Sequence, residues 1–202
     1  MGEFPCRKHP RLPTYDYSQP GAYFVTVCTR DRKPLLCRRR AGCPHPAELP
    51  PGTCLPAEAV FTLTRLGQWT DAAIRRCETV YPNVQILSYV IMPDHWHLLF
   101  RILPDVEMGT SPSGEVSAPC GGMRASGPTI EGKTAARPVS VPQLVRAIKT
   151  SVSRRTGRAI WQGSFYDRIL RSEAELREID AYIRQNPQTW LGAGSHTKEV
   201  LQ

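Results

Sequence analysis

The sequence has no apolar run approaching the roughly eighteen residues that a membrane-spanning helix needs. Its N-terminus also lacks the apolar segment of a secretory signal. We therefore expect a cytoplasmic protein with no membrane partner. With 202 residues, of which 41% are hydrophobic, the chain can build the core of one domain.

The cysteines lack the regular spacing of a disulfide framework. The chain has seven, an odd number, which argues against a disulfide framework and for reduced thiols. A zinc knuckle made of Cys37, Cys43, His45 and Cys54 is a minor alternative, because no pair of these residues has the usual gap of roughly two to four residues.

Acidic residues are nearly absent between residues 137 and 171, where eight basic residues accompany a single acid, Asp167. Aromatic residues are interleaved with the basic ones. Basic side chains neutralise phosphates and aromatic rings stack on unpaired bases, so the segment predicts binding of single-stranded nucleic acid. A solvated helix face is the alternative. The DNA-binding candidates are Arg146, Arg154, Arg155, Arg158, Trp161, Phe165 and Arg168.

The hydrophobic pattern predicts alternating strands and helices. Strands are expected over 21–29, 59–63, 84–102 and either 158–161 or 167–170, with a loop over 37–57. Helices are expected over about 66–79, from Ser140 to Gly157, and from Ser172 to about Gln185, where Pro187 should stop the last one.

The composition changes over residues 105–138, where Gly, Ser, Pro, Thr and Ala dominate. Such a segment cannot bury enough apolar surface to fold by itself. We expect a disordered insertion within a single domain that spans residues 1–202.

Two histidines lie one residue apart in the apolar run of residues 89–100, which reads YVIMPDHWHLLF. Successive side chains of a strand alternate between its faces, so His95 and His97 point the same way and can share one metal ion. Two half-exposed histidines are the plain alternative. An unpaired imidazole in a buried strand is costly, which favours a functional role.

The last predicted helix carries a tyrosine beside its core stripe. Leu176, Ile179 and Ile183 form the stripe, Tyr182 lies next to it, and Asn186 is four residues further on and so on the same face. A tyrosine in such a place is most often a core residue.

The histidine strand, the basic segment WQGSFYDRILR and the helix with AYIRQNP together resemble the single-tyrosine HUH transposases, most closely the REP-associated tyrosine transposases. The resemblance covers most of the chain, although the 105–138 insertion and the 37–57 loop depart from the family pattern. It implies an α+β fold, in which a ferredoxin-like antiparallel sheet has its helices packed on one face.

The resemblance also implies a site. In that family the His-hydrophobe-His strand carries a divalent metal, and a helix tyrosine attacks a DNA phosphodiester. By position, His95 and His97 are the implied ligands of Mg²⁺ or Mn²⁺, Asn186 completes the metal site, and Tyr182 is the nucleophile. We further expect Lys149 to face the site and steady the phosphate.

The implied activity is that of a transposase, which cleaves hairpin-flanked single-stranded DNA through a covalent 5′-phosphotyrosine and rejoins it. The partner would be single-stranded DNA with REP-like hairpins, and both a monomer and a homodimer are compatible with the resemblance. Two alternatives stay open: a catalytically inactive, domesticated transposase that binds hairpins, and a metal-dependent hydrolase using the histidine pair. The chain has too few strand-helix units for the barrel of such hydrolases.

Overall fold

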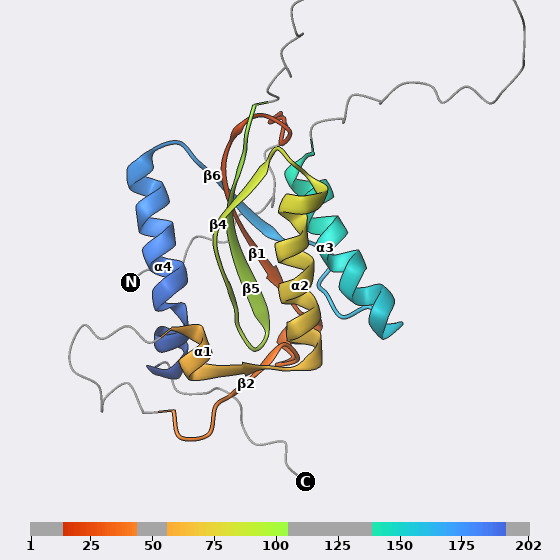
Figure 1. Ribbon diagram of the computed structural model, residues 1–202, viewed down its shortest axis with the longest axis vertical. Coiled ribbons are helices and arrows are strands. Elements are labelled where there is room, and N and C mark those ends of the chain that lie inside the picture. Colours follow the sequence, from red (N-terminus) through yellow and green to blue (C-terminus); the bar gives the residue numbers. More distant parts are fainter. Residues whose placement is uncertain (1–13, 44–55, 105–138, 193–202) are drawn as a thin grey trace, which may run out of the picture.

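A four-stranded antiparallel sheet forms the centre of the computed structural model, which describes residues 14–43, 56–104 and 139–192. Its main elements are β1 (Gly21–Cys28), α2 (Arg65–Val80), β4 (Val84–Ile91), β5 (His95–Ile102), α3 (Val141–Thr156), β6 (Tyr166–Leu170) and α4 (Glu173–Gly192). The strand order is β4-β5-β1-β6, and the sheet lies between α4 on one side and α2 and α3 on the other (Figure 1). This order, with the succession β1-α2-β4-β5-α3-β6, is ferredoxin-like, and the predicted α+β class is confirmed.

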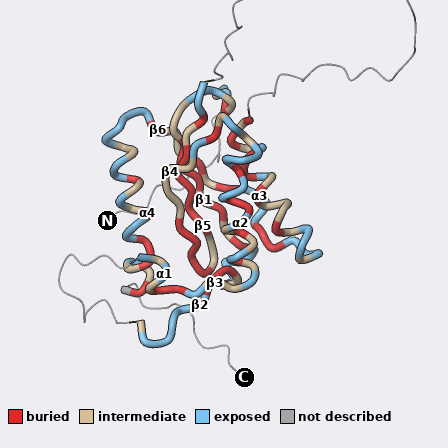
Figure 2. The backbone as a smooth tube through the Cα atoms, viewed as in Figure 1, coloured by how far each residue is buried: buried red, intermediate tan, exposed pale blue. Residues whose placement is uncertain are grey.

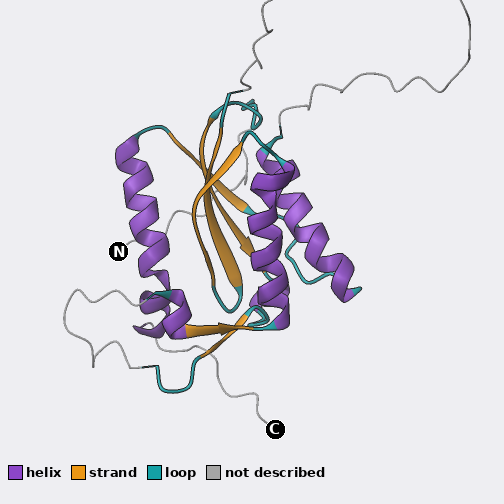
Figure 3. Ribbon diagram, in the orientation of Figure 1, coloured by secondary structure: helices purple, strands orange, loops and turns teal. Residues whose placement is uncertain are grey.

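Four shorter elements complete the described structure: η1 (Arg30–Arg32), β2 (Cys37–Arg39), α1 (Ala57–Val60) and β3 (Phe61–Leu63). Strands β2 and β3 pair as a second, two-stranded antiparallel sheet (Figure 3). From the sequence we expected a loop over residues 37–57, where the structure has β2. This three-residue strand was missed because its sequence, CRR, shows no alternation of apolar and polar side chains. The strand expected over 59–63 is shorter than predicted, since α1 takes its first part.

Buried apolar residues lie on both faces of the sheet, and helices pack on both. Figure 2 shows the strands of the sheet largely buried between these helices. On β1, Tyr23 and Val25 belong to the core under α2 and α3, whereas Phe24 belongs to the core under α4. The prediction that all helices pack on one face is therefore wrong for α4. Ile179 and Ile183 of that helix are buried against strand residues that would otherwise expose apolar surface.

Residues 84–102, predicted as one buried strand, form a hairpin of β4 and β5. Met92 N donates to His95 O across the turn, at 2.8 Å. Pro93 was the available signal, because proline fits a turn and is excluded from a central strand. The turn places His95 at the first position of β5, at one end of the sheet.

Helix α3 begins and ends as predicted, with a capping box between Ser140 and Gln143 and a left-handed Gly157 (φ +64°) after its last turn. Helix α4 follows the expected Ser172, whose hydroxyl accepts a hydrogen bond from Glu175 N at 3.2 Å. Local capping chemistry was therefore sufficient to locate both starts.

Pro187 does not stop α4, which continues to Gly192. Proline removes one N–H from the helix ladder, but packing holds the turn beyond it. The Trp190 ring lies edge-on to Phe61 with 5.3 Å between centroids, and Leu191 is buried. The predicted helix end at Gln185 is therefore wrong.

The remaining predictions have mixed outcomes. Of the two positions considered for the short strand, 167–170 agrees with β6, while Trp161 makes only an isolated bridge with Thr29. The insertion at 105–138 lies outside the described residues, so the single-domain organisation stays a prediction. No helix within the described ranges is long and apolar enough to cross a membrane.

Leu36 ties the hairpin turn to α2 through its backbone. Its N–H donates to Pro93 O and its carbonyl accepts from the N–H of Thr64, the N-cap of α2, both at 2.9 Å. Gly67 packs directly on this link, because a Cβ there would lie 2.0 Å from the Leu36 oxygen. Only glycine fits at that position.

We expect Gly67→Ala to lower the free energy of unfolding by about 1–3 kcal/mol, because the added methyl group must displace backbone. Urea unfolding followed by circular dichroism measures this change. Gly163→Ala is the matched control, since a Cβ at Gly163 meets nothing within 4 Å. Equal losses in the two variants would contradict the close contact at Gly67.

Candidate functional site

His95 and His97 lie on the same face of β5, as predicted, and their rings converge. The two Nε2 atoms are 3.1 Å apart. His97 is 4% exposed, and the side chain of His95 is 12% exposed at the end of the strand. Trp96 between them points to the opposite face and is fully buried there. Strand alternation therefore holds the pair in place from the core.

The other ring nitrogen of each imidazole already has a partner. Asp94 Oδ1 lies 2.6 Å from His95 Nδ1, and Thr26 Oγ1 lies 2.8 Å from His97 Nδ1. An ionised carboxylate only accepts, so His95 Nδ1 carries the proton and Nε2 presents a lone pair. The Thr26 hydroxyl can accept from His97 Nδ1 in the same way, and in that tautomer both Nε2 atoms present lone pairs to a shared metal ion. In another tautomer, one Nε2 donates a hydrogen bond to the other.

Two lone pairs directed to one point fit a divalent cation. The 3.1 Å separation is less than twice a metal–nitrogen distance of roughly 2.1 Å, so one ion can touch both imidazoles. Among the residues that the structure describes, no group of three or more His, Cys, Asp or Glu side chains could hold a metal. The donor set therefore fits a two-histidine site whose further ligands are amide, water or phosphate oxygens.

The protonation states around the pair suit a metal site. Burial holds the pKa of His97 well below its ordinary range, and the charges of His95 and Arg32 act in the same direction. Burial raises the pKa of Asp94, but the hydrogen bond from His95 and the nearby positive charges outweigh it, so this pKa ends below its usual value. A neutral His97 and an anionic Asp94 are the forms that metal binding requires.

Tyr182 approaches the histidines from α4. Its ring lies edge-on to His97, with 5.3 Å between centroids, and edge-on to Phe24 at 6.1 Å. Phe24 in turn stacks on His97 at 5.3 Å. Because Ile179 and Ile183 are buried in the core, the predicted stripe fixes the face of the helix that carries Tyr182. The structure thus brings the predicted nucleophile and the predicted histidine ligands together.

Asn186, one turn after Tyr182, is nearly buried and hydrogen-bonds the Tyr182 hydroxyl. Burial raises the pKa of Tyr182, and the Asn186 hydrogen bond with the charge of Arg32 offsets only part of this effect. Tyr182 is therefore a neutral phenol at neutral pH in the free protein, although Asn186 and Arg32 both favour its phenolate form. Asn186 as a metal ligand stays a prediction.

Arg32 is a residue of this site that the sequence did not reveal. Its guanidinium lies 3.4 Å from Asp94 Oδ2, on the carboxylate that orients His95. Its charge acts on Tyr182, where it lowers the pKa of the phenol. Arg32 therefore supplies the positive charge that the sequence analysis assigned to another residue.

The turn that carries Arg32 has an uncommon backbone. Asp31 and Arg32 have φ of 58° and 53°, in the left-handed region that non-glycine residues seldom adopt. The run RDRK directly after β1 was visible in the sequence. Placing it beside the site also needed the register of β1 and β5, which pairs Cys28 with His95.

Lys149 does not lie with the histidines. Helix α3 packs under the opposite face of the sheet, and Lys149 Nζ donates to the carbonyl oxygens of Gln162 at 2.6 Å and Gly163 at 3.2 Å. The prediction that Lys149 faces the site is wrong. Helical spacing located Lys149 at the edge of its helix, but it carries no information on which face of the sheet the helix covers.

Trp161 and Phe165 are core residues, with 5% and 8% exposure. The Trp161 ring lies edge-on to Trp96 at 6.5 Å, and its Nε1 donates to Lys149 O at 3.1 Å. Buried rings cannot stack on bases, so the prediction of an aromatic DNA-stacking surface is wrong. Composition alone cannot distinguish an aromatic under a basic surface from one on it.

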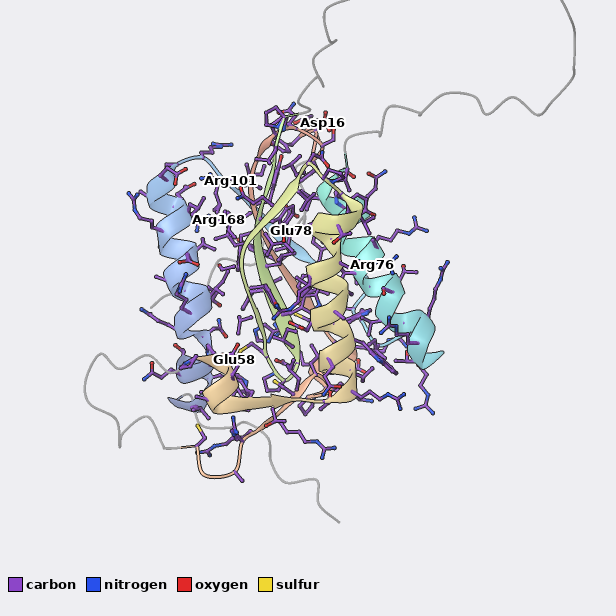
Figure 4. The ribbon with its side chains drawn as sticks, in the orientation of Figure 1. Asp16, Glu58, Arg76, Glu78, Arg101 and Arg168 are labelled. Carbon is purple, nitrogen blue, oxygen red and sulfur yellow. The ribbon has the colours of Figure 1, made fainter. Side chains whose placement is uncertain are left out.

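The predicted DNA-binding arginines occupy three places. Arg146, Arg154 and Arg158 line a pocket beside α3. Arg155 lies over the Trp69 ring of α2, 5.8 Å from its centroid. Arg168 lies on the α4 side of the sheet beside Arg101 (Figure 4), where Glu175 pairs with it at 3.5 Å.

A solved structure with a similar fold is that of a REP-associated tyrosine transposase bound to a REP hairpin, with a TM-score of 0.50 and 21% sequence identity. The match covers 94% of this chain and 74% of that chain. The chain has the fold of a REP-associated tyrosine transposase.

Two other proteins are similar. An uncharacterised protein of Haemophilus influenzae is 26% identical over 189 residues, which are 91% of this chain and 89% of that protein. A solved Deinococcus radiodurans protein matches 88% of this chain and 96% of its own at 15% identity; its TM-score of 0.40 carries no argument. No protein-family model matches the chain.

Proposed function

We propose that this protein is a DNA strand transferase of the transposase type, which cleaves single-stranded DNA beside a hairpin and holds one end covalently on Tyr182. The observation that carries the proposal is the 5.3 Å contact between the rings of Tyr182 and His97, made by two elements far apart in the sequence. A nucleophilic side chain, imidazoles with convergent lone pairs and a nearby arginine are the groups that attack on a phosphodiester needs. The fold shared with the REP-associated tyrosine transposase supports the proposal.

His95 and His97 would hold the divalent metal, Mg²⁺ or Mn²⁺, and Asn186 would complete its ligands from α4. When bound, such an ion polarises phosphate oxygens and orients the phosphate. The chain's own contribution is orientation. Asp94 and Thr26 fix the two imidazole rings, so the open side of the site faces the helix that carries the nucleophile.

In the proposed reaction, Tyr182 Oη forms a bond to phosphorus while the bond from phosphorus to O3′ breaks. The phenol gives up its proton and the departing 3′-oxygen takes one up, which leaves a 5′-phosphotyrosine and a free 3′-hydroxyl. The phosphodiester energy is retained, so strands can be rejoined without ATP. Burial raises the pKa of the phenol further above neutral in the free protein, and the charge of Arg32, which lowers that pKa, would favour its ionisation and steady the phosphate.

We propose that the substrate is hairpin DNA, of the kind to which the solved neighbour is bound, a REP hairpin. The histidine pair begins β5 at an end of the sheet, where an unpaired strand beside a hairpin can reach it. One chain contributes both the histidines and the tyrosine, so a monomer suffices for the proposed chemistry and a homodimer is not required.

The second candidate function is a catalytically inactive module that binds hairpin DNA. The observation that favours it is the partial burial of Tyr182, which raises the pKa of its phenol further above neutral and leaves it a poor nucleophile until it is activated. The two candidates differ in one observable, which is the covalent protein–DNA adduct.

We expect Tyr182→Phe to fold and bind hairpin DNA but to form no adduct, because only the hydroxyl is lost. The assay is denaturing gel electrophoresis after incubation with a labelled hairpin that carries a single-stranded tail. Tyr166→Phe is the matched control, since Tyr166 of β6 pairs with Thr26 of β1 and packs in the same core as Tyr182. Loss of the adduct in Tyr166→Phe alone would show that Tyr166, and not Tyr182, is the nucleophile. Absence of an adduct with the wild-type protein would favour the inactive module.

We expect His95→Ala and His97→Ala each to abolish both Mn²⁺ binding and cleavage, because two imidazoles leave no spare nitrogen ligand. Asn186→Ala should weaken binding less, since a neutral amide is the weakest of the three ligands. Isothermal titration calorimetry should give one Mn²⁺ per wild-type chain. Cleavage that persists unchanged in EDTA would remove the metal from the mechanism.

We expect Arg32→Ala to slow adduct formation by about 10²-fold, the usual loss when one charge-stabilising group is removed. Lys33→Ala is the control, because Lys33 is a neighbouring exposed cation paired only with the exposed Asp31, at 4.0 Å. Mn²⁺ affinity should stay the same in Arg32→Ala. A parallel fall in Mn²⁺ affinity would instead show that Arg32 acts through Asp94 on His95.

A further inference from the structure

Thr29 follows β1 directly and is fully buried, although it carries a polar hydroxyl group. Two carbonyl oxygens share the proton of this hydroxyl, that of Lys33 at 2.7 Å from Oγ1 and that of Asp94 at 3.0 Å. The N–H of Thr29 also donates to Asp94 O, at 2.8 Å. Thr29 therefore joins the end of β1 to the turn η1, which carries Arg32, and to the hairpin turn before His95.

The main chain around Thr29 is held from the opposite side as well. Arg30 N donates to Ile160 O at 2.8 Å, and Gln162 N donates to Cys28 O at 3.0 Å. With residues 28–30 bonded to the hairpin turn on one side and to residues 160–162 on the other, Thr29 has little freedom to move. It is a fixed base from which η1 begins.

The turn η1 is only weakly held by its own backbone. The distances from Arg32 N to Thr29 O and from Lys33 N to Arg30 O are 3.2 and 3.3 Å, longer than the usual distance of about 2.9 Å. Asp31 and Arg32 are also left-handed, a conformation that persists only where surrounding groups impose it. The bond from the Thr29 hydroxyl to Lys33 O, at 2.7 Å, is shorter than either backbone bond and spans the whole turn.

The position of this turn decides where the Arg32 guanidinium lies. The guanidinium is 3.4 Å from Asp94 Oδ2, but the Arg32 side chain is 58% exposed. An ion pair with such an exposed partner holds a side chain only weakly, so the location of Arg32 depends mainly on its backbone. Thr29 fixes both halves of the contact, because it bonds the main chain of Asp94 and closes the turn that carries Arg32.

We propose that Thr29 is a positioning residue of the site, whose buried hydroxyl sets the turn η1 so that Arg32 lies beside Asp94 and can reach the DNA phosphate. Because Thr29 is fully buried, it acts through Arg32 and not by contact with DNA. The inference rests on the proposed function for the role of Arg32, whereas the effect of the hydroxyl on the turn does not depend on that role.

The variant that tests this role is Thr29→Val, which replaces the hydroxyl by a methyl group of similar size. Both carbonyl oxygens keep a donor, since Asp94 O retains the N–H of residue 29 and Lys33 O retains Leu35 N at 2.9 Å. No buried group is orphaned, so the protein should fold. Thr29→Ala, which also lacks the hydroxyl and adds no bulk, is a second variant with the same expected outcome.

Two further variants separate positioning from a general loss of stability. Thr29→Ser is the conservative change, because serine keeps the hydroxyl. Thr70→Val is the matched control, since Thr70 is also fully buried and its Oγ1 donates to Leu66 O at 2.9 Å within α2. Thr29→Val and Thr70→Val each remove one hydroxyl that donates to the main chain, so they should lower the melting temperature to a similar extent.

Adduct formation is measured in a single turnover with saturating Mn²⁺ and a saturating hairpin that carries a single-stranded tail. Thr29→Val should slow it by about tenfold, because a displaced charge-stabilising group lowers the rate of the chemical step. Thr29→Ser and Thr70→Val should keep a rate close to that of the wild-type protein. In an Arg32→Ala background, Thr29→Val should cause no further loss, since the two residues act as one unit.

Hydrogen exchange followed by mass spectrometry gives a second readout that needs no chemistry. Exchange of the amides at residues 30–33 should be faster in Thr29→Val than in the wild-type protein, and unchanged there in Thr29→Ser and Thr70→Val.

A wild-type rate in Thr29→Val, an equally slow Thr29→Ser, or an additive loss in the double variant would overturn the inference. Unchanged exchange at residues 30–33 in Thr29→Val would overturn it as well. If the wild-type protein forms no adduct but exchange at the turn still rises in Thr29→Val, the proposed chemistry fails and the control of the turn by Thr29 stands.

Discussion

The antiparallel pairing of β1 with β5 is the constraint on which the site depends. Its register places Thr26 opposite His97 and Cys28 opposite His95, so the strand that supplies the imidazoles is fixed by the strand that supplies their support. The same pairing puts Phe24 on the face of His97, where it stacks and also meets Tyr182. If the pairing register of β5 shifted by one residue, the side chains of both histidines would point to the opposite face, into the core under α2 and α3.

The features that the sequence predicted well are those decided locally. Alternation located the two histidines on one face, capping residues located the starts of α3 and α4, and the apolar stripe of α4 put Tyr182 beside the core. Each of these depends on residues within a few positions of one another. The resemblance to the transposases then linked them into one site.

The features that the sequence missed depend on long-range packing. Whether Lys149 faces the histidines depends on which side of the sheet α3 covers, and whether Trp161 is a stacking surface depends on what lies under it. Arg32 enters the site only through the β1–β5 register. Helix α4 continues beyond Pro187 because Trp190 packs against Phe61. No window of a dozen residues contains this information.

The two faces of the sheet have different electrostatic characters. On the α4 face, Arg101 pairs with Glu173 and Arg168 with Glu175. Around α3, by contrast, Arg146, Arg154 and Arg158 form no ion pair with a described residue. Surface charges of one sign repel one another, so this cluster does not stabilise the fold.

The backbone link at Leu36 has a consequence for how this fold can diverge. Two of its hydrogen bonds join main-chain atoms only, one to the turn before His95 and one to Thr64 before α2, and the Thr64 hydroxyl also donates to Leu36 O at 3.0 Å. Replacement of the Leu36 side chain leaves those bonds possible, unless the new residue is proline. An inserted or deleted residue in the segment from η1 to β2 would shift every donor and acceptor out of alignment. The main-chain hydrogen bonds of this link therefore depend on the length of the chain between η1 and β2 more than on which side chain residue 36 carries, although the buried Leu36 side chain itself belongs to the core.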